Sequence, residues 1–263
     1  MNESWIFDHP YYSEINRARE PIVRRIAPAL AASSSERPSA IDVACGVGHY
    51  SRILDSLGFN VLGVDARTAN VEEARRRYPD LRFEAFNAED SSLARLGVFD
   101  LVFCFGLLYH LENPFQTIRS LAAIASNAVM IEGICYPSSE PVMVLMDEYE
   151  SFDQGINRVA FYPSESCIVK MLLKAGFSEC YLPKQMPENG EYSRDSLGFR
   201  RRTVLVGSKT KLASEALTPW PDPPSYLDPH PVAKVAPLLP IRGRSGQVHL
   251  LVERLRPNKT PRG

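Results

Sequence analysis

Hydrophobic and polar positions alternate with two different periods along the central part of the chain. Short apolar runs that are typical of β-strands cover residues 40–44, 60–64, 81–86, 99–105 and 128–132. Between them, apolar residues recur at helical spacing over residues 50–57, 69–78 and 114–124. This alternation predicts a parallel, right-handed doubly wound sheet and hence a Rossmann-like α/β fold.

A separate amphipathic pattern precedes the first strand. Apolar residues recur every three or four positions from Ser13 to Leu30, which predicts an N-terminal helical cap. Pro21 and Pro28 should kink or divide this helix. The serine-rich stretch 33–39 is expected to be a loop.

The alternation of strand and helix patterns ends after the fifth predicted strand. Residues 136–162 include prolines and methionines, and we expect an insertion on the substrate side, over the carboxyl edge of the sheet. Helical spacing returns over residues 164–175, where Ser164 suits an N-cap and Gly176 a C-cap. Insertion and helix are thus predicted as distinct segments.

The end of the chain differs in composition from the rest. A short strand is expected over 178–182 and a last core strand from Arg201, after which prolines become frequent. Proline excludes an ordinary helix or central strand, so this part should wrap the surface, with a weak edge-strand pattern over 247–255. We therefore predict a helical cap (1–38), a central α/β domain (39–209) and a proline-rich extension (210–263).

The composition of the chain limits the cellular environments and the binding partners that are expected for the protein. The formal net charge of −1 gives no overall positive field that would attract nucleic acid. The cysteines are scattered, which favours buried, reduced thiols, and no close set of histidines, cysteines and acids indicates a metal site. No run of about 18 apolar residues indicates a membrane span, so a soluble, cytoplasmic protein is expected.

The first strand leads into the sequence IDVACGVGHYS, which holds an acid and a glycine-rich turn. Gly46 and Gly48 let the backbone turn sharply and pass close to a ligand. The third glycine of a dinucleotide motif is replaced by Ser51, and Asp42 adds negative charge that suits a cationic group better than a phosphate. The turn therefore favours a cationic amino-acid group over a pyrophosphate.

Acids and amides also end the next two strands. Asp65, at the tip of the second strand, can accept hydrogen bonds from both hydroxyls of a ribose. Asn87 to Asp90 follow the third strand, where an amide or carboxylate can accept from an adenine amine. In this order, at one edge of a parallel sheet, they predict a nucleoside site.

Together these motifs resemble the class I S-adenosylmethionine-dependent methyltransferases, from about Ser39 to Lys209. The resemblance implies S-adenosylmethionine (SAM) as cofactor, held by residues matching the family's motifs: Asp42, Ala44, Cys45, Gly46, Gly48, Asp65, Ala66, Asn87, Ala88, Glu89 and Phe105. Cys45 occupies a position of small residues, so packing is expected there instead of nucleophilic chemistry.

The fourth motif, FDLVFCFGLLYHLENP, places Tyr109 and His110 at the transfer zone by the same resemblance. Together with NRVAFYPSESCIVKMLLKAGF, it resembles the branch of tRNA wobble-uridine carboxymethyltransferases and their small-molecule relatives. The chain departs from the tRNA enzymes in having no long basic N-terminal extension and no basic excess, so RNA is not the expected substrate. Both Arg75 to Arg77 and Arg200 to Arg202 are interpreted as solvated charges.

Methyl transfer is an in-line displacement, so the enzyme mainly positions the acceptor and excludes water. Histidine is the side chain suited to removing a proton near neutral pH, which makes His110 the candidate base. The alternative is a structural histidine that ties down the following loop. Tyr109 either donates a hydrogen bond or packs in the pocket.

The cap helix and the insertion supply the remaining candidates. Arg17 or Tyr12 could meet the methionyl carboxylate. For the acceptor, the expected contacts are Tyr11, Glu148, Tyr149 and Phe152, because loops over a rigid sheet edge usually carry selectivity.

The leading hypothesis is a methyltransferase that modifies an oxygen or nitrogen of a small-molecule acceptor, with no nucleic acid or membrane partner. A tRNA-modifying transferase and a non-catalytic SAM-binding regulatory module stay open as alternatives. The oligomeric state is also open, with a homodimer as one option.

Overall fold

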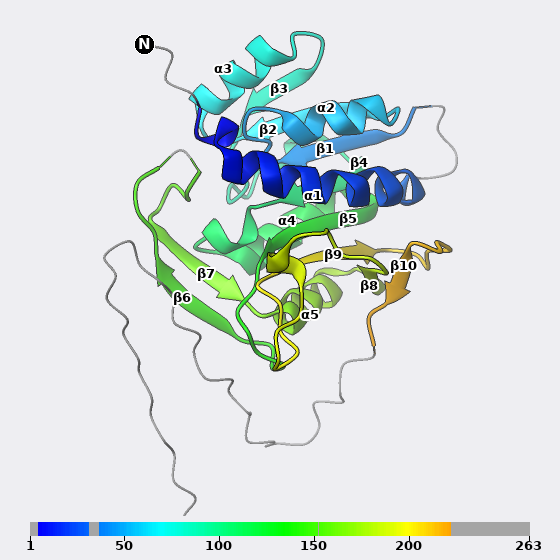
Figure 1. Ribbon diagram of the computed structural model, residues 1–263. Coiled ribbons are helices and arrows are strands. Elements are labelled where there is room, and N and C mark those ends of the chain that lie inside the picture. Colours follow the sequence, from blue (N-terminus) through cyan, green and yellow to red (C-terminus); the bar gives the residue numbers. More distant parts are fainter. Residues whose placement is uncertain (1–4, 32–36, 152, 222–263) are drawn as a thin grey trace, which may run out of the picture.

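An eight-stranded sheet runs through the centre of the protein, in the order β10-β8-β9-β5-β4-β1-β2-β3 (Figure 1). The computed structural model describes residues 5–31, 37–151 and 153–221. Its strands are β1 Ser39–Val43, β2 Asn60–Asp65, β3 Arg82–Ala85, β4 Phe99–Phe105, β5 Ala125–Ile134, β6 Met143–Asp147, β7 Val159–Pro163, β8 Glu179–Pro183, β9 Arg202–Ser208 and β10 Leu217–Pro219. Its α-helices are α1 Pro10–Ile26, α2 His49–Ser56, α3 Thr68–Arg77, α4 Pro114–Ile124 and α5 Glu165–Ala175.

The α/β Rossmann-like fold and the parallel arrangement of its first five strands are confirmed, while the last part of the sheet is antiparallel. Strands β3, β2, β1, β4 and β5 are parallel, whereas β9 runs antiparallel to both β5 and β8. A parallel neighbour needs a crossover connection, usually through a helix. Between β8 and β9 the chain forms only the short 3-10 helix Gly190–Tyr192, so β9 returns beside β8 in the opposite direction.

The N-terminal helix starts earlier than expected and is not broken by its inner proline. His9 accepts a hydrogen bond from the Tyr11 amide as N-cap, and Pro10 occupies the first turn, where its missing N–H costs little. Pro21 lies inside α1, and the helix changes only after Ile26, where a 3-10 helix over Ala27–Leu30 contains Pro28. Thus Pro28, and not Pro21, marks the division.

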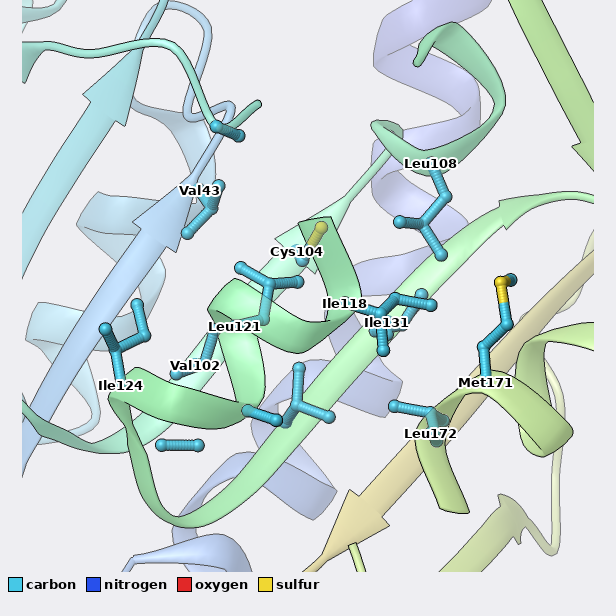
Figure 2. Packing of buried hydrophobic residues seen from close by; sticks show 14 of the residues in the cluster. Val43, Val102, Cys104, Leu108, Ile118, Leu121, Ile124, Ile131, Met171 and Leu172 are labelled. Atoms are coloured by element: carbon cyan, nitrogen blue, oxygen red, sulfur yellow. The ribbon is translucent and has the colours of Figure 1, made fainter. Parts of the chain in front are cut away.

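Two apolar layers cover the two faces of the sheet. Successive strand residues point to opposite faces, so in β4 Val102 and Cys104 pack on the α4 and α5 side, which Figure 2 shows. Leu101 and Phe103 pack on the other side, against α1 and α2. Buried apolar area on both faces fixes the sheet and holds its carboxyl edge in place.

The insertion at 136–162 contains a pair of strands that the sequence pattern did not predict. Antiparallel β6 and β7 form a second sheet, set apart from the main one in Figure 1. The Phe161 amide donates to the Leu111 carbonyl at 3.1 Å, which ties β7 to the segment after β4. The hairpin therefore lies at the carboxyl end of the parallel strands.

The proline-rich extension begins with ordered structure. Strand β10 pairs with the edge strand β8, a position that tolerates proline. The edge strand expected over 247–255 and most of the expected loop at 33–39 lie outside the described residues. Within the described part, no helix is long and apolar enough to cross a bilayer.

Candidate active site

A cavity of about 460 Å³ opens at the carboxyl ends of the parallel strands, beside α1 and the loop after β6. Most of the expected site residues line it. They are Tyr11, Tyr12, Arg17, Ala44, Cys45, Gly46, Asp65, Ala66, Asn87, Ala88, Glu89, Phe105, Tyr109 and His110. The sequence motifs of β1 to β4 thus meet in one place.

The turn after β1 has an unusual backbone. Ala44 and Gly46 have φ of 62° and 54°, and both face the cavity. A positive φ is uncommon for alanine and persists only where surrounding structure holds it, often at binding sites. Gly48, with φ of 86°, does not line the cavity; a Cβ there would lie 2.9 Å from Phe83 Cζ, so its role in the structure is close packing.

Asp42 lies behind the cavity wall instead of on it. Its side chain accepts a hydrogen bond from the Ser51 hydroxyl at 2.7 Å and is 2 % exposed. Burial raises the pKa of Asp42 to about 7, although the Ser51 hydrogen bonds oppose this shift. The replacement of a motif glycine by Ser51 therefore supplies the partner of this buried carboxyl group.

Asp65 is fixed at the cavity wall by three donors. Its Oδ2 accepts from the Gly46 amide at 3.0 Å, and its Oδ1 accepts from the Arg67 amide at 2.9 Å and from Asn70 Nδ2 at 3.1 Å. Burial raises its pKa, and these hydrogen bonds oppose the rise. A carboxylate has about four acceptor sites, so Asp65 retains capacity for a ligand hydroxyl.

The segment after β3 forms another wall of the cavity, and its polar side chains accept hydrogen bonds mainly from backbone amides. Asn87 Oδ1 accepts from the Glu89 amide, and Glu89 Oε1 accepts from the Asn113 amide at 2.7 Å. Ala88 is 5 % exposed and lines the cavity between them. Asp90 does not line it, and its carboxylate caps the turn through the Ser92 amide.

His110 is paired with Glu148 from the insertion. Its Nδ1 shares a short hydrogen bond with Glu148 Oε1, while Glu148 Oε2 accepts from the Gly155 amide at 2.9 Å. The side chain of Glu148 is only 2 % exposed. Glu148, expected to contact an acceptor, instead holds the imidazole, and Nε2 is the ring nitrogen left for a ligand.

The loop between β6 and β7 is tied over the cavity at two further points. The Tyr12 hydroxyl donates to Asp153 Oδ2 at 2.5 Å, and burial together with this bond raises the pKa of Tyr12. Arg67 donates to the carbonyl oxygens of Ser151 and Gln154 at 3.0 and 3.1 Å. These bonds join α1, the end of β2 and the insertion around one space.

A buried charge network, which the sequence did not predict, lies behind the cavity wall and reaches it through Arg19, Tyr109 and Arg202. Glu132, fully buried in β5, binds Arg19 at 2.9 Å and Arg202 at 3.1 Å, and accepts from the Tyr192 hydroxyl at 2.6 Å. Burial alone would raise the pKa of Glu132, but the two arginines outweigh it and lower the pKa. Arg202 also donates to the Tyr109 hydroxyl.

The interpretation of Arg202 as a solvated charge was therefore wrong, because its guanidinium finds a buried counter-charge. The one signal for Glu132 in the sequence was an acidic residue at the end of the otherwise apolar run AVMIE. Of the other expected acceptor contacts, Tyr149 is 59 % exposed and does not line the cavity, and Phe152 lies outside the described residues.

Cysteine chemistry and metal binding gain no support from the described residues. All five cysteines are buried and unpaired, and burial raises the pKa of the Cys45 thiol far above its usual range. A protonated thiol is a poor nucleophile. Within 5–31, 37–151 and 153–221, no group of three or more His, Cys, Asp or Glu side chains could hold a metal ion.

Comparison with known proteins agrees with this geometry. Residues 41–127 match a family model described as "Methyltransferase domain". A tRNA U34 carboxymethyltransferase of Alcanivorax borkumensis is 29% identical over 71% of this chain and 66% of its own. A ubiquinone biosynthesis O-methyltransferase of Colwellia psychrerythraea is 30% identical over 35% of this chain and 39% of its own. The chain thus spans less than two thirds of the length of these relatives.

Solved structures share the fold at low identity. The N-terminal domain of EvdMO1 with SAH bound superimposes with a TM-score of 0.62, at 18% identity, over 76% of this chain and 84% of that one. Magnesium protoporphyrin IX methyltransferase from Synechocystis PCC 6803 gives a TM-score of 0.51, at 21% identity, over 77% and 85%. The sheet, the family match and the motifs at the strand ends together identify the chain as carrying a class I SAM-dependent methyltransferase domain.

Proposed function

We propose that the protein transfers a methyl group from SAM to an oxygen or nitrogen of a small-molecule acceptor, with His110 as the base. The observation that carries this proposal is the pairing of His110 with Glu148 at the wall of a cavity whose other walls suit a nucleoside. Each part of the proposal rests on a separate group of residues.

The cavity fits the cofactor in size and in donors and acceptors. Its volume of about 460 Å³ falls in the range of small-molecule sites. Asp65 would accept from the ribose, and Asn87 to Glu89 would flank the adenine. Arg17, which lines the cavity from α1, would meet the methionyl carboxylate, while the Ala44 to Gly46 turn offers a close backbone approach.

When bound, SAM supplies an activated methyl group on a positively charged sulfur. The protein's own residues then position the acceptor and accept its proton. Glu148 holds Nδ1 of His110, which favours the tautomer that carries its proton on Nδ1 and leaves Nε2 free to remove a proton. The loop bound to Tyr12 and Arg67 covers the space and restricts water.

The charge of the cavity supports a small acceptor over RNA. Arginines and carboxylates line it in equal number: Arg17, Arg19, Arg67, Arg77 and Arg202 against Asp8, Glu20, Asp65, Glu89 and Asp153. An RNA site would need an excess of positive charge to hold phosphates. The likeness to tRNA U34 carboxymethyltransferases is the observation that keeps a tRNA substrate as the second candidate.

One labelling experiment separates these candidates. The full chain is incubated with methyl-labelled SAM and with either a small-molecule cell extract or total tRNA. We expect label to enter the small-molecule fraction with wild type and to fall about a hundredfold with His110→Ala. Label in tRNA, with tight salt-sensitive tRNA binding, would favour the second candidate. Binding of S-adenosylhomocysteine without label in either fraction would favour a regulatory module.

A further inference from the structure

A second cavity, of about 410 Å³, lies between the end of β5, the start of α5 and Trp220. It shares no lining residue with the candidate active site. The turn formed by residues 194–199 closes one side of it. Asp195 Oδ1 accepts from the amides of Leu197 and Phe199, both at 2.9 Å, so this wall has a defined conformation.

Arg200 lines this cavity and carries a buried, poorly satisfied guanidinium. Its side chain is 9% exposed, and its Nε and Nη1 have no hydrogen-bond partner. Glu165 Oε1 lies 3.5 Å from Nε, beyond good hydrogen-bond distance, and the same oxygen accepts from the Thr203 hydroxyl. Leaving buried charged donors unpaired is costly, so this arrangement needs an explanation.

The local charges do not balance. Arg194 Nη2 lies 3.6 Å from Glu165 Oε2, so a single carboxylate faces two guanidinium groups. Burial lowers the pKa of Arg200, Glu165 opposes this, and Arg194 adds to it. Among the described residues that line the cavity, these three carry the charges, which leaves one positive charge uncompensated.

The remaining wall is partly aromatic and partly hydroxylated. Tyr136, Leu182, Phe199 and Trp220 supply apolar surface, and Ser138, Ser139 and Ser166 supply hydroxyl groups. We propose that this cavity binds a small organic oxyanion, with its carboxylate or phosphate on Arg200 and its apolar body against Trp220. Such a ligand would complete the hydrogen bonding of Arg200 and neutralise the excess charge.

Trp220 provides a direct readout. The chain has two tryptophans, Trp5 and Trp220, so Trp5→Phe leaves a single reporter in the cavity. In this background, fluorescence is titrated with benzoate, with phenyl phosphate and with neutral benzamide. We expect saturable changes with one or both anions and none with benzamide, and the stronger anion identifies the preferred head group.

Matched arginine variants locate the site. Arg200→Gln should weaken anion binding by about tenfold or more, because charged hydrogen bonds are lost. Arg201→Gln, at a side chain that is 68% exposed, should leave it unchanged. Arg194→Gln serves as a second variant if Arg200→Gln does not fold. Equal affinity in all three variants, or a response to benzamide equal to that of the anions, would overturn the proposal.

Discussion

Glu148 binds Nδ1 of His110 with one carboxylate oxygen and the Gly155 amide with the other. The two side chains come from different parts of the chain, the hairpin insertion and the segment after β4. A base is effective only when its tautomer and orientation are fixed before the reaction. The pair therefore connects the insertion to the proposed chemistry.

His110→Ala should reduce turnover on the order of a hundredfold, because it removes the proposed proton acceptor. Affinity for S-adenosylhomocysteine, measured by titration calorimetry, should stay close to that of wild type. If the variant instead unfolds or loses cofactor binding, the structural role of His110 gains support over the catalytic one.

Glu148→Gln should change the pH dependence of turnover and lower its maximum, because an amide no longer favours one tautomer of His110. The matched control is Glu150→Gln, whose side chain is 77% exposed and pairs only with Arg158 in the described structure. Identical pH–rate profiles for Glu148→Gln and wild type would show that the pair does not position the imidazole.

Asp65→Ala should weaken S-adenosylhomocysteine binding by at least ~1 kcal/mol, through loss of charge-assisted hydrogen bonds to the ribose. Calorimetry measures this change directly. Asp80→Ala, at an exposed aspartate of the same domain, is the control and should bind normally. An unchanged affinity in Asp65→Ala would remove the ribose assignment.

These residues also show what a single sequence reveals. The strands and helices from β1 to β5, and helix α5, followed from hydrophobic period and from capping residues such as Ser164, because both act over a few neighbouring positions. The position of Asp65 at the cavity could be predicted for a similar reason, since a polar residue at the end of a parallel strand lies at a known edge of the sheet.

The sequence pattern gave no comparable signal for contacts between segments that lie far apart in the chain. Glu148 lies 38 positions from His110, and Arg202 lies 70 from Glu132, so each pairing depends on strand order and loop conformation. The direction of β9 was missed because it depends on the connection from β8, not on its own apolar pattern, and a buried parallel and antiparallel strand look alike in sequence.

Gly155→Ala should distort the loop that holds Glu148. A Cβ at this position would lie 2.3 Å from the His110 carbonyl oxygen, so the loop must shift, at a cost of about 1–3 kcal/mol. Thermal unfolding and turnover should both report the change. Gly190→Ala is the control, because a Cβ there meets nothing within 4 Å. Equal melting temperatures would show that the loop is not closely packed on His110.

Asp42 should make the protein less stable as the pH rises. Folding raises its pKa from 3.8 to about 7, so the folded state binds the proton more tightly than the unfolded chain. The resulting stabilisation is complete below about pH 4 and is lost as the pH rises to about 7, with a slope of up to about 1.4 kcal/mol per pH unit.

Asp42→Asn should remove this slope, since the amide cannot ionise. The free energy of unfolding is measured in urea between pH 5 and 8. It should fall for wild type relative to the variant as the pH rises to about 7, and then level off. Asp80→Asn, at an exposed site, should follow wild type throughout. If wild type and Asp42→Asn run parallel across this range, the carboxyl group is already ionised in the folded protein at pH 5, and burial does not raise its pKa to about 7.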